Sequence, residues 1–133
     1  MDTADLHRRL FGAVAARDLD AIRTYYDPAA EFSGPDGSVG DVDAAMAYAG
    51  LYLTAFPDLA VEVVRQWAPC EEVSVVEYRA RGTHLGDLAG IAPTGRSVTG
   101  VGCNVIEARD GKVVHEREYS DSLSVMQQLG VLR

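Results

Sequence analysis

The stretch Gly111–Gly130, GKVVHEREYSDSLSVMQQLG, holds the signals that decide the fold. Strand side chains alternate between the two faces of a sheet, and this stretch divides accordingly into two sets. One set is mixed in character and consists of Val113, His115, Arg117, Tyr119 and Asp121. The other is mostly acidic and consists of Val114, Glu116, Glu118 and Ser120. Because an acidic face suits solvent or a subunit contact, we expect the mixed set to point into the protein.

Asp121 ends this strand, and a short helix follows it. Helical spacing relates Leu123, Met126 and Gln127, and Gly130 is placed to end the helix. Two interpretations of Asp121 are open. It is a pocket carboxylate, which burial would oblige to find water, a donor or a chemical role, or it caps the helix, a role that Ser122 could also take.

The first half of the chain predicts three helices. Their N-terminal caps are expected at Asp2 or Thr3, at Asp18, and at Asp41 or Asp43. The third helix reaches about Phe56 and carries Tyr48, Tyr52 and Phe56 on one face, which indicates either core packing or a pocket wall. A brief strand is expected at 30–33, between the second and third helices.

The second half predicts an antiparallel meander. Alternating apolar residues indicate strands at 59–67, 73–84, 97–109 and 113–121, with a Gly/Pro-broken loop at 85–96. Helices followed by such a meander indicate an α+β fold, in which helices pack on one face of a strongly curved, mainly antiparallel sheet. The 133 residues form one domain, 1–133, by size.

The dipeptide Asp110-Gly111 is the strongest hairpin signal in the chain. A two-residue turn there places Gly102 opposite Tyr119 and Gly100 opposite Asp121, on one face of the sheet. The two glycines then leave room for a ligand, or they mark strand bends or the contact of a packed helix. A bulge in the hairpin would shift this register by one residue.

Composition excludes several function classes. The net charge of −8 argues against binding nucleic acid or anionic membranes, and no apolar run is long enough to span a bilayer. The N-terminus lacks the apolar core of a signal peptide, so a cytoplasmic protein is expected. Cys70 and Cys103 are expected to be free thiols, and the three histidines show no metal-ligand spacing.

Several segments, in this order, resemble the SnoaL-like polyketide cyclases of the nuclear transport factor 2-like superfamily. They are Phe56-Pro57-Asp58-Leu59, Gly82-Thr83-His84-Leu85-Gly86, Gly90–Arg96, Asp110–Val113 and Gln128-Leu129-Gly130. The resemblance covers nearly the whole chain and is strongest from Phe56 to Gly130. It implies a cone-shaped barrel with an apolar pocket, and a homodimer or homotetramer formed through the outer face of the sheet.

The resemblance also implies a cofactor-independent enzyme of antibiotic-type polyketide biosynthesis. The reaction expected is an intramolecular aldol closure of an aromatic or polycyclic substrate, with an aspartate at the position of Asp121 as general acid/base. Those cyclases carry a histidine partner on the neighbouring strand, where this chain offers Asn104, a candidate substrate-binding residue, and Glu107 but no histidine. Other functions open to the scaffold are non-catalytic binding of a small apolar molecule, hydrolysis, isomerisation and hydroxylation.

The remaining candidate residues follow from this chemistry. Arg117 could hold an enolate or carboxyl oxygen, and Tyr119 could donate to an oxyanion. His84 is a catalytic candidate or the donor of a structural hydrogen bond, and Ser33 stands on a strand that contributes to the pocket in this family. Aromatic side chains expected to bind a flat substrate are Tyr52, Phe56, Trp67 and Tyr78.

Overall fold

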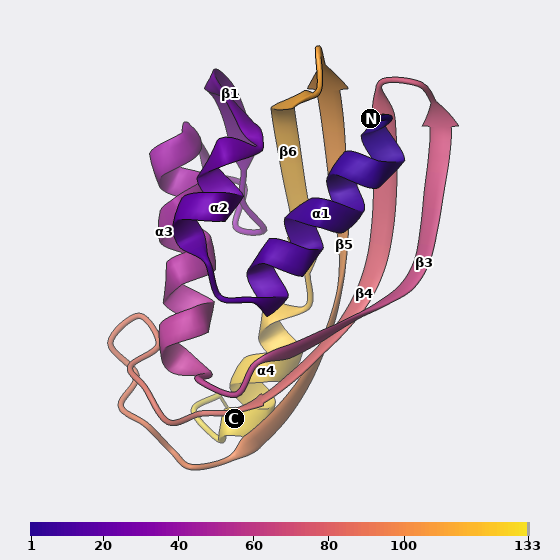
Figure 1. Ribbon diagram of the computed structural model, residues 1–133. Coiled ribbons are helices and arrows are strands. Elements are labelled where there is room, and N and C mark those ends of the chain that lie inside the picture. Colours follow the sequence, from indigo (N-terminus) through magenta and orange to yellow (C-terminus); the bar gives the residue numbers. More distant parts are fainter. Residues whose placement is uncertain (133) are drawn as a thin grey trace.

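The computed structural model describes residues 1–132 as four helices against a six-stranded sheet (Figure 1). The helices are α1 (Thr3–Ala15), α2 (Leu19–Thr24), α3 (Val42–Ala55) and α4 (Ser122–Leu129). The strands are β1 (Tyr26–Ser33), β2 (Val39–Gly40), β3 (Ala60–Cys70), β4 (Val73–Thr83), β5 (Ser97–Arg109) and β6 (Lys112–Ser120). The predicted α+β fold is confirmed, although β1 is longer than expected.

The strand order is β2-β1-β6-β5-β4-β3, and the sheet is not closed into a complete barrel. Every neighbouring pair is antiparallel except β1 and β6, which run parallel. Helices α1, α2 and α3 lie over one face, and α4 packs on β5 at the end where β6 stops (Figure 1). The concave side of the sheet is therefore covered by helices contributed by both ends of the chain.

An aspartate caps each helix, as the sequence predicted for these positions. Each side chain accepts a hydrogen bond from the backbone N–H three residues on, which satisfies a donor that the helix itself leaves unpaired. These caps are Asp2, Asp18, Asp41 and Asp121. Gly130 ends α4 in the left-handed conformation, with a φ of 76°, as predicted.

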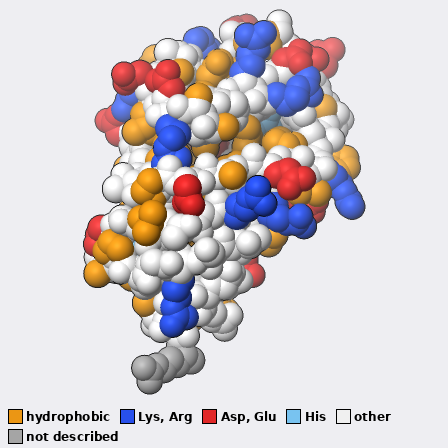
Figure 2. All heavy atoms as spheres, turned by 60° about the horizontal axis from the view of Figure 1, so that its bottom comes forward, with side chains coloured by type: hydrophobic (Ala, Val, Ile, Leu, Met, Phe, Trp, Pro, Cys, Tyr) orange, Lys and Arg blue, Asp and Glu red, His pale blue; other side chains and the backbone are white. Residues whose placement is uncertain are grey.

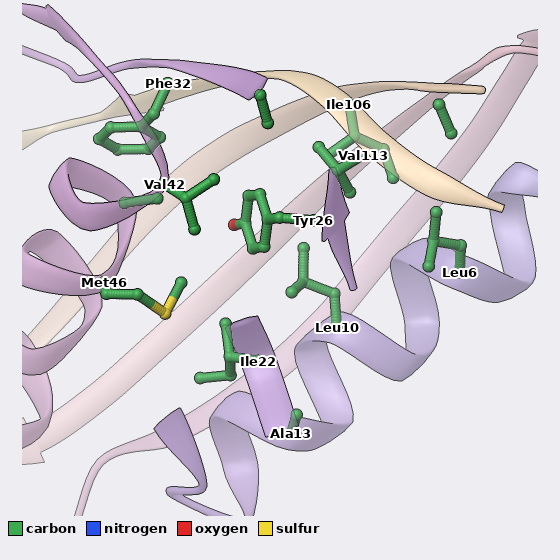
Figure 3. Close-up of a cluster of buried hydrophobic side chains, with 13 residues drawn as sticks. Leu6, Leu10, Ala13, Ile22, Tyr26, Phe32, Val42, Met46, Ile106 and Val113 are labelled. Atoms are coloured by element: carbon green, nitrogen blue, oxygen red, sulfur yellow. The ribbon is translucent and has the colours of Figure 1, made fainter. Parts of the chain in front are cut away.

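The larger core cluster lies between the helices and the β1–β6–β5 part of the sheet. In Figure 3 the side chains of Leu10 on α1 and of Met46 on α3 lie on either side of the Tyr26 ring, and Leu6 lies farther along α1, beyond Val113. Tyr26, on β1, is 8% exposed and belongs to this cluster together with residues of α1 and α3. On α1, the buried apolar side chains Leu6, Leu10 and Ala13 follow one face of the helix and form this contact.

A β-bulge in β6 overturns the predicted hairpin register. Asp110-Gly111 does form the turn, and Ala108 pairs with Val113, but Glu107 then pairs with His115, so Val114 is an extra residue. A bulge reverses the faces of every residue beyond it. The predicted inward facing is therefore wrong for His115, Arg117 and Tyr119, and the acidic set points into the protein, whereas Asp121, just beyond the strand, still lines the cavity.

The two glycines of β5 move with this register. Gly102 pairs with Ser120, and the Asp121 N–H donates to the carbonyl of Val101, so neither predicted pairing is found. A Cβ on Gly102 would overlap the Tyr78 hydroxyl, whereas one on Gly100 would meet Val125 Cγ2 at 3.6 Å. Gly102 therefore makes room for Tyr78 rather than for a ligand beside Tyr119.

A second bulge occurs in β3. Val63 pairs with Tyr78, but Arg65 pairs with Glu77, so Val64 is the extra residue. Beyond it Trp67 falls on the outer face of the sheet, where it is 47% exposed. Val101 and Tyr119 are also exposed on strands of this sheet, and assembly through the outer face stays a prediction.

Gly102→Ala should lower the free energy of unfolding by about 1–3 kcal/mol, because the added methyl group overpacks the site that Tyr78 fills. Gly100→Ala is the matched control and should change stability by less than about 1 kcal/mol, since its methyl group meets Val125 at an ordinary distance. Urea unfolding of both variants measures the difference. Equal stability of the two would show that Tyr78 does not occupy this position.

Candidate active site

A cavity of about 170 Å³ opens between the helices and the concave face of the sheet. A void of about 150 Å³ already holds a benzene-sized guest, so the cavity has room for at least one ring, and its mouth is open to solvent. Its walls are mainly apolar, and their aromatic members are Phe11, Tyr26, Phe32, Tyr48, Tyr52, Phe56 and Tyr78. Such walls suit a flat, apolar molecule.

Two glutamates stand side by side on the cavity floor. Glu116 and Glu118 are two residues apart on the inner face of β6, and they are 7% and 5% exposed. The side-chain nitrogen of Asn104, on the neighbouring strand β5, donates to Glu116 Oε2 at 2.9 Å and to Glu118 Oε2 at 3.0 Å. One amide thus holds both carboxyl groups.

Two tyrosines satisfy the remaining carboxyl oxygens. The Tyr26 hydroxyl donates to Glu116 Oε1, and the Tyr78 hydroxyl donates to Glu118 Oε1. Burial, assisted by the adjacent carboxyl groups, raises the pKa of Tyr26 and of Tyr78. Both phenols therefore stay protonated and act as donors at any physiological pH.

His7, on α1, fixes the orientation of Asn104 from behind. The Asn104 amide oxygen only accepts, so His7 donates to it through Nε2 at 2.7 Å. The Nδ1 of His7 lies 2.7 Å from the Ser74 hydroxyl, which supplies the complementary donor. Burial lowers the pKa of His7 to about 4, although the hydrogen bond to Asn104 acts in the opposite direction. The ring is therefore neutral at pH 7.

Burial also raises the pKa of both glutamates. Desolvation is the largest cause for each, and hydrogen bonds from a tyrosine and from Asn104 oppose it. The charge of Glu116 acts in the same direction as burial on Glu118, whose pKa rises to about 7. A group with this pKa can both take up and release a proton near neutral pH.

Asp121 lies at the mouth of the cavity, where it is exposed and caps α4 through the Ser124 N–H at 3.0 Å. The two interpretations of this residue are thus compatible, because it lines the cavity and caps the helix at once. Hydroxyl groups occupy the wall between it and Glu118: Tyr48 Oη lies 3.4 Å from Ser120 Oγ, and Ser122 also lines the cavity. Burial raises the pKa of Tyr48, which keeps this phenol a donor.

Six of the predicted site residues line the cavity. They are Tyr52, Phe56, Tyr78, Gly100, Asn104 and Asp121. The aromatic face predicted on the third helix contributes both to core packing and to the pocket wall, the two roles considered for it. Tyr52 and Phe56 stack at 6.3 Å between ring centroids, and Phe56 is buried in the smaller core cluster while also forming part of the wall.

Four other predicted residues lie outside the cavity. Past the Val114 bulge, Arg117 and Tyr119 face outward, and Arg117 pairs with Glu107 at 3.2 Å. Ser33 pairs with Arg117 across the parallel β1–β6 ladder and so shares its outer face. Trp67 is displaced by the β3 bulge. The prediction that these four side chains face the pocket is wrong. For Arg117, Tyr119 and Trp67 it assumed unbroken alternation along the strand, and for Ser33 it assumed that a residue on this strand faces the pocket.

His84 is fully buried but does not line the cavity. Its Nδ1 accepts a hydrogen bond from the Thr94 N–H at 3.1 Å, and its ring packs on Phe56 at 5.7 Å. Its Nε2 has no hydrogen-bond partner among the residues that the structure describes. The geometry supports the structural interpretation, in which His84 holds the 85–96 loop against α3.

Sequence reasoning did not select His7, Glu116 or Glu118. A signal for His7 was present, because it stands in the apolar stripe of the first helix beside Leu6 and Leu10. A histidine in such a stripe needs a buried partner. The glutamates carried no such signal, because they were assigned to the wrong face.

On the end of the molecule that carries α4, hydrophobic side chains lie among charged ones (Figure 2). Leu85 and Leu123 are exposed on this side. Arg81 and Asp121 line the cavity mouth. A substrate entering here would meet apolar surface with separated charges of both signs.

Comparisons with known proteins address the family to which this chain is related. The family model of the SnoaL-like polyketide cyclases matches residues 4–129. Aklanonic acid methyl ester cyclase AcmA of Streptomyces galilaeus is 38% identical over 71 aligned positions. That match covers 47% of this chain and 49% of the relative, so the chain spans about half the length of the curated relative it matches.

Solved structures with the same fold include proteins with different proposed activities. AclR of Streptomyces galilaeus, proposed to be a hydroxylase, is 25% identical with a TM-score of 0.87, over 97% of this chain and 85% of its own. IdmH of Streptomyces antibioticus, proposed to be a polyketide cyclase, is 26% identical with a TM-score of 0.83, over 96% and 97%. No helix among residues 1–132 has the length and apolar character needed to cross a membrane. Because the family model spans nearly the whole chain, this protein belongs to the SnoaL-like polyketide cyclase family.

Proposed function

We propose that this protein closes a ring in a polyketide-type substrate by acid/base catalysis within the cavity, without a cofactor. The observation that carries the proposal is an aromatic-walled cavity with carboxyl groups at two depths, Asp121 at the mouth and Glu118 on the floor. The family and the cyclase relative support ring closure as the reaction type. A cavity that only bound an apolar ligand would have no use for the buried carboxyl pair, which is unfavourable to desolvate.

An aldol closure fits these groups. A base removes a proton from carbon next to one carbonyl, the resulting enolate carbon attacks a second carbonyl, and the new alkoxide oxygen takes up a proton. No atom leaves the substrate, so neither an oxidant nor a leaving group is required. Asp121 is the proposed base, because its carboxylate is exposed at the mouth and already held in place by the start of α4.

The substrate class follows from the cavity walls. Tyr48, Tyr52 and Phe56 present a continuous aromatic surface along α3, with ring centroids 5.1 Å and 6.3 Å apart. Such a surface binds planar, conjugated molecules better than flexible aliphatic ones. A partly cyclised aromatic polyketide that still carries a reactive side chain is the proposed substrate, with the open mouth accommodating the part that the cavity cannot enclose.

Asp121→Asn should reduce the single-turnover rate by about 10²–10⁴-fold, the range expected for losing a positioned proton-transfer group. Asn caps a helix about as well as Asp, so the fold and ligand affinity should be retained. The test compound is aklanonic acid methyl ester, which the name of the curated relative supplies. Asp41→Asn makes the same change at the cap of α3, away from the cavity, and should leave the rate unchanged.

A rate for Asp121→Asn within a few-fold of the wild-type rate would remove Asp121 from the mechanism. It would leave capping of α4 as the role of this side chain. Loss of rate in both variants would instead point to a general effect of weakened helix starts.

Turnover should also be insensitive to metal removal. The proposed chemistry uses only carboxyl and hydroxyl groups of the chain, so dialysis against a chelator should leave the rate unchanged. The measurement compares the rate before dialysis, after dialysis, and after adding back Mg²⁺, Zn²⁺ or Fe²⁺. Activity that disappears and returns with one metal would contradict the proposed mechanism.

A further inference from the structure

Proton removal by Asp121 at the cavity mouth does not require the buried carboxyl pair. Even so, the pair accepts four side-chain hydrogen bonds. Each of Glu116 and Glu118 accepts one hydrogen bond from a tyrosine and one from Asn104. Two carboxylates that share one amide in a desolvated site repel each other strongly if both are ionised. Such a pair relieves the repulsion by keeping one proton between its members.

We propose that Glu118 is the general acid of ring closure, and that it delivers the proton held by the Glu116–Glu118 pair to the alkoxide oxygen of the aldol step. This inference rests on the proposed function. It adds a second catalytic carboxyl group at a position for which neither the family resemblance nor the relatives supply a role.

The steps balance as follows. Asp121 takes the proton from the substrate carbon, and the electron pair of that C–H bond forms the new C–C bond. The π electrons of the attacked carbonyl move to its oxygen, which then takes the proton from Glu118. The pair is left with one more negative charge, Asp121 with one fewer, and exchange of protons with water restores both.

Placement favours Glu118 over Glu116 as the donor. Along the inner face of β6, Glu118 is followed by Ser120 and then by Asp121 at the mouth, so it is the nearer of the two glutamates to the base. Glu116 pairs with Ile106 and Phe32 on the adjoining strands, beside Tyr26 and deep in the larger core cluster. A substrate whose reacting carbon reaches Asp121 can extend its carbonyl toward Glu118, past the hydroxyls of Tyr48 and Ser120.

Asn104 and His7 are positioning residues for this acid. Because His7 donates to the Asn104 oxygen, the Asn104 nitrogen must face the carboxyl pair. That nitrogen favours the ionised form of Glu118 and so limits how far burial raises its pKa. Removing His7 frees the amide to turn, which should raise the pKa of Glu118.

The groups that face Glu118 come from every element around it. Tyr48 and Tyr52 lie on α3, Tyr78 on β4 and Asn104 on β5, with Glu116 on the same strand as Glu118. Tyr26 and His7 stand behind Glu116 and Asn104. Both tyrosines nearest Glu118 have raised pKa values, and His7 is neutral above about pH 4. The carboxyl pair is therefore the group in this set that titrates near neutral pH.

The role of Glu118 as general acid predicts the alkaline side of the pH–rate profile. A general acid works only while protonated, so the rate should fall as pH rises through about 7, the pKa of Glu118. Glu118→Gln keeps the shape of the side chain but cannot deliver a proton. It should slow turnover of aklanonic acid methyl ester by about 10²–10⁴-fold, leave ligand affinity within a few-fold, and abolish the alkaline fall near pH 7.

Glu107→Gln is the matched control. Glu107 lies on β5 and pairs with Arg117 on the outer side of the sheet, so the same change there should leave rate and profile unaltered. His7→Phe tests the positioning role, because it should move the alkaline fall to higher pH. His7→Gln, which can still donate to Asn104, should restore it toward the wild-type position.

Infrared spectroscopy provides a readout that needs no substrate. The carbonyl-stretch band of a protonated carboxyl group should persist in the wild-type protein up to about pH 7. This component, which disappears near pH 7, should remain in Glu107→Gln and be lost from Glu118→Gln, in which any remaining band belongs to Glu116. If Glu118→Gln does not fold, the wild-type band still decides the question, since its absence at pH 6 would overturn the inference.

The outcomes separate this inference from the proposed function. If the wild-type protein does not cyclise the ester, the proposed function fails and the role of Glu118 fails with it. If the wild-type protein turns over, Asp121→Asn does not, and Glu118→Gln keeps both its rate and its alkaline fall, then only the role of Glu118 is overturned.

Discussion

The side chain of Asn104 is the contact on which the interior of this protein depends. Its oxygen accepts from His7 on α1, and its nitrogen donates to both Glu116 and Glu118 on β6. An apolar residue at this position would leave two carboxyl oxygens and an imidazole N–H buried without partners, each unfavourable by about 1–3 kcal/mol. The first helix, the central strand and the cavity floor are thus fixed relative to one another by one amide.

This arrangement balances two opposite pH responses. Glu118 has a folded-state pKa raised to about 7, so its contribution to stability is complete below its ordinary value of 4.5 and is lost as pH rises through about 7. His7 has a folded-state pKa lowered to about 4, so its contribution is complete above 6.5 and is lost as pH falls through about 4. Between pH 4.5 and 6.5 the two slopes oppose each other, and the network changes little in total stability over the range in which its carboxyl proton remains in place.

The sequence predicted the elements well and the faces of two strands badly. Helix caps, the Asp110-Gly111 turn and the left-handed Gly130 are local signals, and the structure has all of them. The bulges in β3 and β6 have no such signal. Each extra residue, Val64 and Val114, is the second valine of a Val-Val pair, so one valine points inward in either register. Alternation alone therefore cannot decide which face the residues beyond each Val-Val pair occupy.

The errors in the candidate site follow from this single ambiguity. With an unbroken β6, Arg117 and Tyr119 enter the pocket and the glutamates face solvent. With the bulge, the two sets exchange places. The prediction for the third helix was not affected, because a helix has no equivalent one-residue ambiguity. Tyr52 and Phe56 line the cavity, which agrees with the pocket-wall interpretation of their aromatic face. Asn104, which contacts His7 from 97 residues away, donates to both glutamates in the bulged register, and alternation within the strand carries no information about such long-range contacts.

The environment separates the roles of the two cavity carboxyl groups. Asp121 stands exposed at the start of α4, where its side chain accepts a hydrogen bond from the Ser124 N–H. Glu118 stands against aromatic rings and a second carboxyl group, which favour the protonated form. A carboxylate and a carboxylic acid at opposite ends of one cavity are the two states that an aldol closure needs at once. The bulge at Val114 is what makes this possible, because without it Glu118 would lie on the solvent side of the sheet.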